Sequence, residues 1–174
     1  MRVSILCLSL CIPVCAIAQG NEHTLSPEWK TYLAEKGALR ASGTTALTAE
    51  YSREKTRECP DAKNNAQNNL CQSAETEKTQ KNYEEYVRAI GGLLRLLPPG
   101  VRALDASSTP APDVAKEFDT AESAWSLYRE DQCKALSDQY YEGTMSPGAY
   151  LGCKQELTQR HMHELEWLYG DLWH

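Results

Sequence analysis

The sequence is poor in aromatic residues, which make up 8% of its 174 residues and include a single phenylalanine. Beyond residue 18 it has no apolar run long enough to cross a bilayer, so no membrane span is expected there. It also lacks the period-two alternation of β-branched and aromatic residues that marks strands. These absences leave an all-α fold as the prediction, and the scarcity of large apolar side chains makes covalent cross-links valuable to its stability.

Basic residues are in the minority. Eighteen Lys and Arg residues stand against 24 Asp and Glu residues, which gives a net charge of −6. Nucleic acids and anionic membrane surfaces are therefore poor partners, and a cationic protein is a better one. An acidic surface is also the ordinary route to solubility, so the charge alone does not specify a partner.

The N-terminus has the features of a secretory signal. Residues 1–18 carry Arg2 as their only charge, continue with an apolar run and end in the small-x-small cleavage site Ala16-Ile17-Ala18. Val14, not a small residue, precedes Cys15, which favours a cleaved, soluble product over a lipid-anchored one. We therefore expect a periplasmic or secreted protein whose remaining 156 residues hold 17 basic and 24 acidic side chains, a net charge of −7.

Seven cysteines occur in the chain, and cleavage of the signal would remove three of them. The remaining four, Cys59, Cys71, Cys133 and Cys153, are an even number in an oxidising compartment, which predicts two disulfides. Turn-forming residues lie inside both intervals, so we expect the local pairs Cys59–Cys71 and Cys133–Cys153. With all four paired, no thiol is left for nucleophilic catalysis.

The first part of the exported chain, residues 19–56, is expected to be an N-terminal extension outside the main domain. Ser26-Pro27-Glu28 is a helix-entry signal that combines a capping hydroxyl, a first-turn proline and an acidic residue. Gly37 is placed to end this short helix. Residues 38–48 are mostly Ala, Ser, Gly and Thr, and we interpret them as a linker with no core of its own.

Residues 57–174 are predicted to form one small helical bundle stapled by the two disulfides. Apolar residues at three- and four-residue steps indicate a helix from about Leu70 onward. Gly91-Gly92 should weaken or bend that helix, and the breaker Pro98-Pro99-Gly100 should end it.

The C-terminal part is predicted to be an antiparallel helical hairpin. One helix begins near Asp113, and the last begins at Ser146-Pro147 after a glycine-containing turn. The bond between Cys133 and Cys153 would clamp the hairpin close to its tip. The inner face of the first of these helices is expected to consist of Val114, Phe118, Ala121, Trp125, Tyr128 and Leu136.

Several of these residues together resemble a known family. The two early cysteines are followed by the segment Ala121–Cys133 (Ala-Glu-Ser-Ala-Trp-Ser-Leu-Tyr-Arg-Glu-Asp-Gln-Cys), by Glu142-Gly143-Thr144, by Cys153 and by Leu157-Thr158-Gln159-Arg160. Over about residues 57–170 this pattern resembles the LprI-type lysozyme-inhibitor domain, with Glu122 at the family's usual glutamine and Glu142 at a usual glycine. The resemblance implies an exported helical domain and, for the family's namesake, inhibition of lysozyme.

The matched residues favour structural roles over catalysis. Trp125 is expected to be a core anchor, and Arg129 and Arg160 structural ties to nearby acidic groups or carbonyls. The many carboxylates include no pair singled out for glycosidase chemistry. His161 and His163 point about 200° apart on a helix, so they cannot hold one ion. We therefore expect no enzyme, no metal and no cofactor.

The remaining class of function is binding. The hairpin tip offers aromatic, hydroxyl and carboxylate groups on a turn next to a disulfide, and we take Tyr141, Glu142, Thr144 and Ser146 as candidate target-binding residues. The expected partner is a cationic lysozyme-class hydrolase, whose encounter the acidic charge would speed. Two alternatives remain open: an immunity-type protein against another secreted wall hydrolase, and a structural cell-envelope protein with no enzymatic target. The sequence does not specify the oligomeric state.

Overall fold

The computed structural model describes residues 25–56, 59–101, 112–141 and 143–174, so the predicted signal peptide lies outside the described residues. Four long helices follow one another: α1 (Pro27–Glu54), α2 (Asn65–Arg95), α3 (Val114–Asp138) and α4 (Ser146–Tyr169). A short 3₁₀ helix, η1 (Gly170–Trp173), follows α4. The described residues contain no strand, which confirms the all-α prediction.

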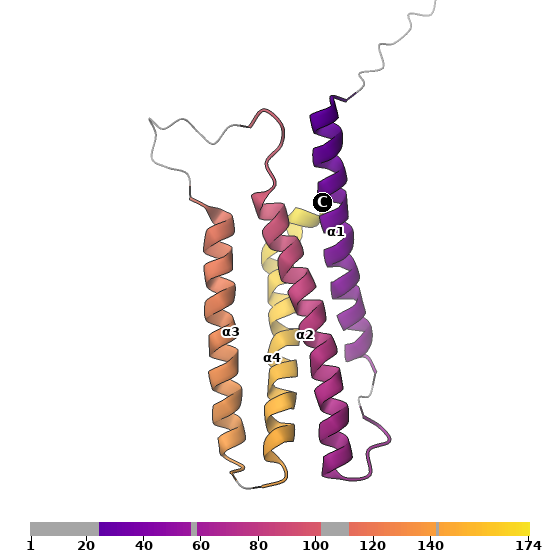
Figure 1. The fold of residues 1–174 in the computed structure, drawn as a ribbon, viewed down its shortest axis with the longest axis vertical. Helices are drawn as coiled ribbons and strands as arrows, with labels where there is room; N and C mark the ends of the chain where they lie inside the picture. Colours follow the sequence, from indigo (N-terminus) through magenta and orange to yellow (C-terminus); the bar gives the residue numbers. More distant parts are fainter. Residues whose placement is uncertain (1–24, 57–58, 102–111, 142) are drawn as a thin grey trace, which may run out of the picture.

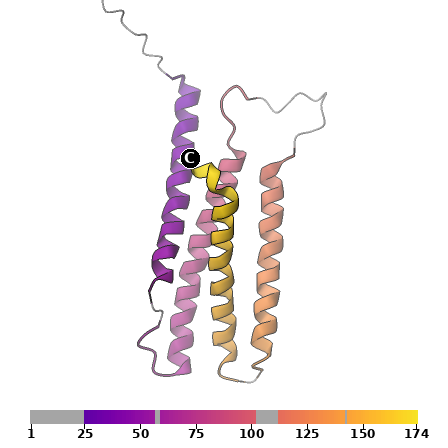
Figure 2. The ribbon, with the colours of Figure 1, turned by 180° about the vertical axis from the view of Figure 1, so that it is seen from behind.

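Successive helices run antiparallel and form a bundle (Figure 1). α2 is the central helix, because it packs against α1, α4 and α3, while α4 also packs against α3. Seen from behind, α4 lies in front, with α1 and α3 on either side of it (Figure 2). The predicted C-terminal hairpin is therefore present as α3 and α4, and its tip lies at the same end of the bundle as the start of α2.

The prediction of a short helix followed by a linker in residues 19–56 was wrong. A single helix, capped by the Ser26 side chain, runs from Pro27 to Glu54. The small residues that we interpreted as a linker allow close helix packing instead. A Cβ added at Gly43 would lie 2.2 Å from Trp173 Cη2 and 3.0 Å from Ala89 Cβ. Small side chains in α1 thus make room for neighbouring elements, and tertiary contact overrides the low helix propensity of glycine.

A buried carboxylate fixes the second half of α1 to its neighbours. Glu50 is fully buried. It accepts hydrogen bonds from Thr79 at 2.6 Å, Asn82 at 2.7 Å, Gln159 at 2.9 Å and Arg53 at 3.2 Å. These donors come from α1, α2 and α4, so α1 is joined to the bundle by a buried charge whose hydrogen-bonding capacity is satisfied.

α2 starts earlier and continues further than the sequence indicated. Asn64 caps it by accepting a hydrogen bond from the Gln67 amide at 2.9 Å, so the helix begins at Asn65 and not near Leu70. It passes through Gly91-Gly92 without a break. A Cβ on Gly92 would lie 2.7 Å from Leu39 Cδ2, so this glycine allows α1 to approach closely.

The inner face of α3 was only partly predicted. Phe118 is buried and Trp125 and Leu136 are partly buried, but Val114, Ala121 and Tyr128 are exposed. The buried positions that replace them include the polar residues Glu122 and Arg129. An apolar pattern misplaces such a face, because it assigns charged side chains to solvent.

The core lies between α2, α4 and their neighbours. Its largest fully buried apolar side chains are Tyr86, Ile90, Met162 and Leu165. The chain after α4 folds back onto it: the Trp173 ring stacks on Tyr86 with centroids 5.5 Å apart. Burial raises the pKa of Tyr86 to about 12.

Candidate functional site

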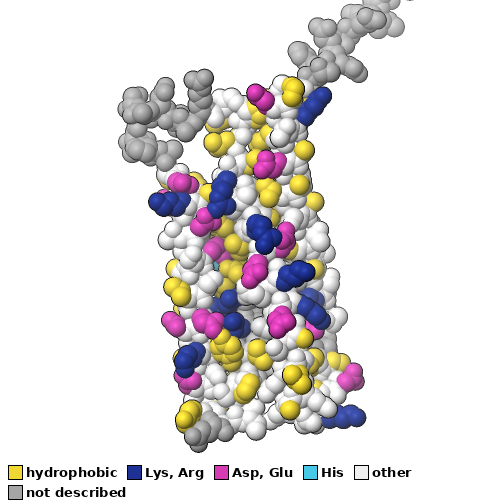
Figure 3. All heavy atoms as spheres, viewed as in Figure 1, with side chains coloured by type: hydrophobic (Ala, Val, Ile, Leu, Met, Phe, Trp, Pro, Cys, Tyr) yellow, Lys and Arg dark blue, Asp and Glu magenta, His cyan; other side chains and the backbone are white. Residues whose placement is uncertain are grey.

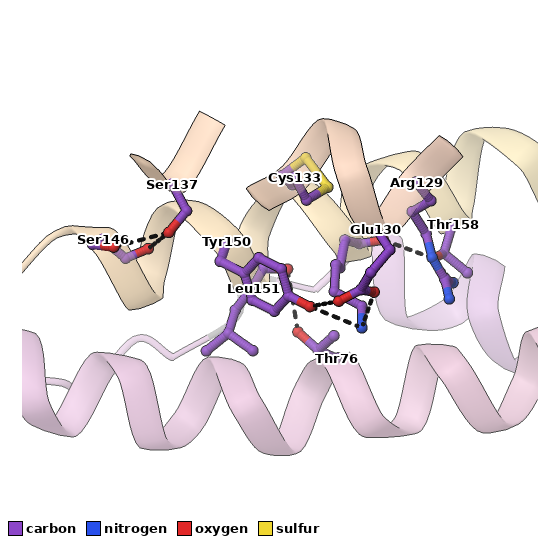
Figure 4. The surroundings of a disulfide bond; sticks show 11 residues. Thr76, Arg129, Glu130, Cys133, Ser137, Ser146, Tyr150, Leu151 and Thr158 are labelled. Carbon is purple, nitrogen blue, oxygen red and sulfur yellow. Dashed lines mark hydrogen bonds and ion pairs between the residues drawn. A yellow bond between two sulfur atoms is a disulfide. The ribbon is translucent and has the colours of Figure 1, made fainter. Parts of the chain in front are cut away.

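Covalent and polar contacts fix the base of the α3–α4 turn (Figure 4). The predicted bond between Cys133 and Cys153 is present, with the two Cα atoms 5.4 Å apart. Closer to the tip, the Ser137 hydroxyl lies 2.8 Å from the Ser146 hydroxyl and 3.1 Å from its carbonyl oxygen. Ser146 is the first residue of α4, whose cap position is held by Met145 without a side-chain capping bond. The Ser146 side chain instead makes a contact across the hairpin.

One turn further from the tip, a charged group joins the two helices. The Tyr150 hydroxyl donates to Glu130, and Lys154 Nζ lies 3.0 Å from the same carboxylate. These two hydrogen bonds, the Tyr150 bond first, lower the pKa of Glu130. Burial, followed by the bond to Glu130, raises the pKa of Tyr150. In addition to the disulfide, two sets of polar contacts therefore join α3 and α4: the Ser137–Ser146 contact and the contacts of Glu130.

The tip itself exposes large side chains. Tyr141 is 80% exposed and Met145 is 59% exposed, although both belong to residue types that are usually buried. Thr144 is also exposed, and its hydroxyl accepts a hydrogen bond from Asn65 Nδ2 at 3.0 Å. Of the four predicted target-binding residues, Tyr141 and Thr144 therefore lie on the surface, Ser146 is half-buried, and Glu142 lies outside the described residues.

The start of α2 lies beside this tip and is held by the other disulfide. Cys59 and Cys71 are bonded, with Cα atoms 5.8 Å apart. The Ala62 amide donates to the Cys59 carbonyl at 3.3 Å, so the chain turns over Pro60-Asp61 as predicted. Both local pairings expected from the sequence are thus present, and each fixes a helix end at the same end of the bundle.

Between the start of α2 and the hairpin lies a hollow of about 420 Å³. Four carboxamide side chains of α2 line it, and they recur at the steps of one helix face: Asn65, Asn68, Asn69 and Gln72. This face was not identified from the sequence. The three- and four-residue spacing of the carboxamides was the signal that could have revealed it.

The family-matched arginine of α3 lies in a buried polar cluster away from the tip. Arg129 is buried, and its Nη1 donates to Gln80 Oε1 and to Thr158 Oγ1, each at 2.8 Å. Its guanidinium carbon lies 4.9 Å from the centre of the Trp125 ring. Arg129 thus connects α2, α3 and α4, as a structural residue should, although its partners are neutral side chains and not the acidic groups we expected.

The same cluster contains a histidine and a carboxylate. His161 stacks on Trp125 with ring centroids 3.9 Å apart, and its Nε2 lies 3.1 Å from both Glu122 oxygens. The Tyr83 hydroxyl donates to Glu122 at 2.8 Å. Burial, followed by the charge of Glu122, raises the pKa of Tyr83. Glu122 and His161 are both buried, so the pair lies in the interior of the bundle.

The remaining predicted structural residue lies on the surface. Arg160 is 71% exposed in its side chain and pairs with Glu156 at 2.6 Å, one turn earlier in the same helix. Among the described residues it therefore makes no ion pair between helices, and such an exposed pair contributes little to stability. His163 points away from His161, as predicted, and bonds Glu54 at 3.0 Å and Tyr51 at 3.1 Å on α1.

In the described parts of the chain, no group of three or more His, Cys, Asp or Glu side chains could hold a metal ion. Within the same residues, no helix is both long and apolar enough to cross a membrane. The arrangement offers hydrogen-bonding and apolar contact surfaces at one end of the bundle.

The fold and its two clamps define the class of protein, a small all-α bundle stapled by local disulfides. A family model described as lysozyme inhibitor LprI matches residues 59–165, more than half of the chain, so the chain belongs to this family. No curated protein and no solved structure matches the chain. The matched residues cover α2, α3 and most of α4, whereas α1 lies outside them. At the level of the family, this is a lysozyme-inhibitor-type protein.

Proposed function

We propose that the chain is an exported, non-enzymatic binding protein that inhibits lysozyme or a related peptidoglycan hydrolase through the α3–α4 turn. The family supports this class of target. The observation that supports this surface is an exposed Tyr141 and Met145 on a turn whose base is fixed by the Cys133–Cys153 bond. Because the base of the turn is fixed before a partner arrives, its insertion into an enzyme cleft costs less conformational entropy.

Charge and compartment support the same partner. The chain carries a net charge of −6, and an acidic protein meets a cationic lysozyme-class hydrolase faster than a neutral one does. Two disulfides persist in the periplasm or outside the cell, where wall hydrolases act. Inhibition should therefore weaken as salt rises past about 0.15 M, where the Debye length is about 8 Å.

The test is an inhibition assay with paired variants. The protein without residues 1–18 is added to cationic lysozymes and to bacterial wall hydrolases, and the inhibition constant is measured. Replacing both exposed tip residues, Tyr141→Ala with Met145→Ala, should weaken inhibition at least tenfold and leave the melting temperature nearly unchanged. Trp167→Ala is the matched control, because Trp167 is 81% exposed but lies at the far end of α4.

The outcomes separate the alternatives. Unchanged inhibition by the tip double variant would move the contact surface elsewhere on the bundle. Selective inhibition of a bacterial wall hydrolase with no effect on lysozymes would identify an immunity-type protein. No inhibition across the panel would leave a structural envelope role and would exclude the function proposed here.

A further inference from the structure

The hollow beside the hairpin tip has no charged residue in its lining. Charged residues make up 24% of the chain, yet this hollow is lined by carboxamides, Tyr140, Thr144 and apolar or small residues. On the face drawn in Figure 3, the end of the bundle that holds the α3–α4 turn is mostly uncharged between α2 and that turn. We propose that this hollow binds a neutral, N-acetylated oligosaccharide such as a chain of N-acetylglucosamine units.

The carboxamides of the hollow have hydrogen-bonding capacity that the protein does not use. Asn68, Asn69 and Gln72 are half-buried, and none of their side chains has a hydrogen-bond partner among the described residues. Gln72 Oε1 is even shielded from solvent without a partner. Because most buried polar groups in proteins are paired, the unpaired Gln72 oxygen supports a ligand in the hollow, and the half-buried Asn68 and Asn69 can hydrogen-bond to it.

Glycine at one position leaves room for these groups to converge. A Cβ on Gly148 would lie 2.9 Å from Asn69 Oδ1 and 3.3 Å from Gln72 Oε1. Both oxygens therefore lie above the α4 backbone, where any larger residue would press against them. The rim on the tip side is closed by the bond from Asn65 Nδ2 to the Thr144 hydroxyl.

The lining selects the chemistry of the ligand. A carboxamide both donates and accepts, which matches the hydroxyl and acetamido groups of an N-acetylated sugar. A charged ligand would lose its hydration in the hollow and find no opposite charge there, so its binding would be unfavourable. The Tyr140 ring, Leu136 and Met145 supply apolar surface for the CH-rich face of a sugar ring. The volume of about 420 Å³ is within the range of small-molecule sites.

The hollow continues along the bundle, which favours an oligomer over a single sugar. A second hollow of about 430 Å³ shares Gln72 and Gly152 with the first and extends along α4 to His163. From Met145 to His163 the helix rises about 27 Å, enough for several sugar units. The second hollow contains Glu54, Glu156 and Arg160, so it suits charged substituents on a longer chain.

This inference goes beyond inhibition, because it gives the domain an affinity for N-acetylated sugar chains. The test uses the N-acetylglucosamine tetramer as the probe and the protein without residues 1–18. Calorimetry gives the dissociation constant, and nitrogen-15 NMR follows the side-chain amide signals of Asn68, Asn69 and Gln72. Binding with shifts confined to these signals and to residues near Gly148 is the expected result.

Paired variants assign the site. Asn69→Ala with Gln72→Ala should weaken binding of the tetramer at least tenfold without lowering the melting temperature, because neither side chain has a hydrogen-bond partner in the part of the chain that the structure describes. Gln132→Ala, an exposed carboxamide of α3 outside the hollow, should leave binding unchanged. An unacetylated glucose tetramer should bind at least tenfold more weakly than the acetylated one.

Several results would overturn the inference. If the tetramer did not bind at millimolar concentration, the hollow would hold only water and the proposed sugar site would be excluded. Equal binding of both tetramers would remove the selectivity for acetamido groups, and preferential binding of a short peptide would identify a different ligand class. None of these measurements involves a hydrolase. Oligosaccharide binding can therefore be disproved while inhibition is observed, and inhibition can be disproved while oligosaccharide binding is observed.

Discussion

Trp125 and Tyr128 lie three residues apart on α3, yet only one of them contributes to the interior. Trp125 is partly buried, and its ring stacks on His161 at 3.9 Å, whereas Tyr128 is 56% exposed. We expect Trp125→Ala to lower the free energy of unfolding by about 3 kcal/mol and Tyr128→Ala to change it by less than about 0.5 kcal/mol. Urea denaturation of the two variants measures both values. Equal losses would mean that the stacked cluster adds nothing to stability.

At the same scale, Arg129 was taken from the sequence as a structural residue, but its partners were not identified. A buried arginine needs hydrogen bonds, which is why its position beside Trp125 on α3 indicated a structural residue. Its acceptors, Gln80 and Thr158, belong to two other helices, and no local pattern connects them to α3. The burial of Glu50 could not be predicted either, because nothing around it in the sequence distinguishes a buried glutamate from a solvated one.

At the scale of the element, two glycines of α1 should respond oppositely to the same substitution. Gly37 has no atom within 4 Å of an added Cβ, whereas Gly43 faces Trp173 at 2.2 Å. Gly37→Ala should stabilise by about 0.5–1 kcal/mol through helix propensity. Gly43→Ala should destabilise by about 1–3 kcal/mol, because Trp173 must leave its place on Tyr86.

Thermal unfolding of both variants, followed by circular dichroism, makes this comparison. A second readout is the fluorescence of the tryptophans, which should change for Gly43→Ala and stay as in the parent for Gly37→Ala. If Gly43→Ala were as stable as Gly37→Ala, the packing of η1 against α1 would not hold in solution.

The helices show where sequence patterns suffice. Asp113 was correctly placed at the start of α3, and Pro98-Pro99-Gly100 follows the end of α2, because caps and breakers act locally. The local disulfides were predicted for the same reason. α1 was misjudged since its small residues have meaning only against α2 and Trp173, which are distant in sequence. The carboxamide hollow was missed because two helix ends and a turn must meet before it exists.

At the scale of the whole molecule, folding should weaken in acid. Hydrogen bonds lower the pKa of three glutamates: Glu75 through Lys78 and then Arg53, Glu85 through Ser42, and Glu130 through Tyr150 and Lys154. A lowered folded-state pKa means that the unfolded chain binds more protons. Their stabilisation is therefore complete above the ordinary glutamate value of 4.5 and is lost as the pH falls through the folded-state pKa values.

Urea midpoints measured between pH 7 and pH 3 should stay level to about pH 5 and then decline. Tyr150→Phe supplies the control, because it removes the strongest cause of the low pKa of Glu130. This variant should decline less steeply between pH 5 and pH 3. A midpoint that is independent of pH over this range would contradict the assignment.

The bond between Cys133 and Cys153 also changes what proteolysis can do to this molecule. Every peptide bond from residue 133 to residue 153 lies inside a covalent ring, and the exposed Tyr141 is the natural point of attack for a protease that prefers aromatic residues. One cut there adds a water molecule but releases no fragment, because the two pieces remain joined through sulfur. The nicked chain separates only on reduction, and α3 and α4 stay paired in the meantime. A domain built this way can lose the continuity of the loop that carries Tyr141 and still remain one molecule.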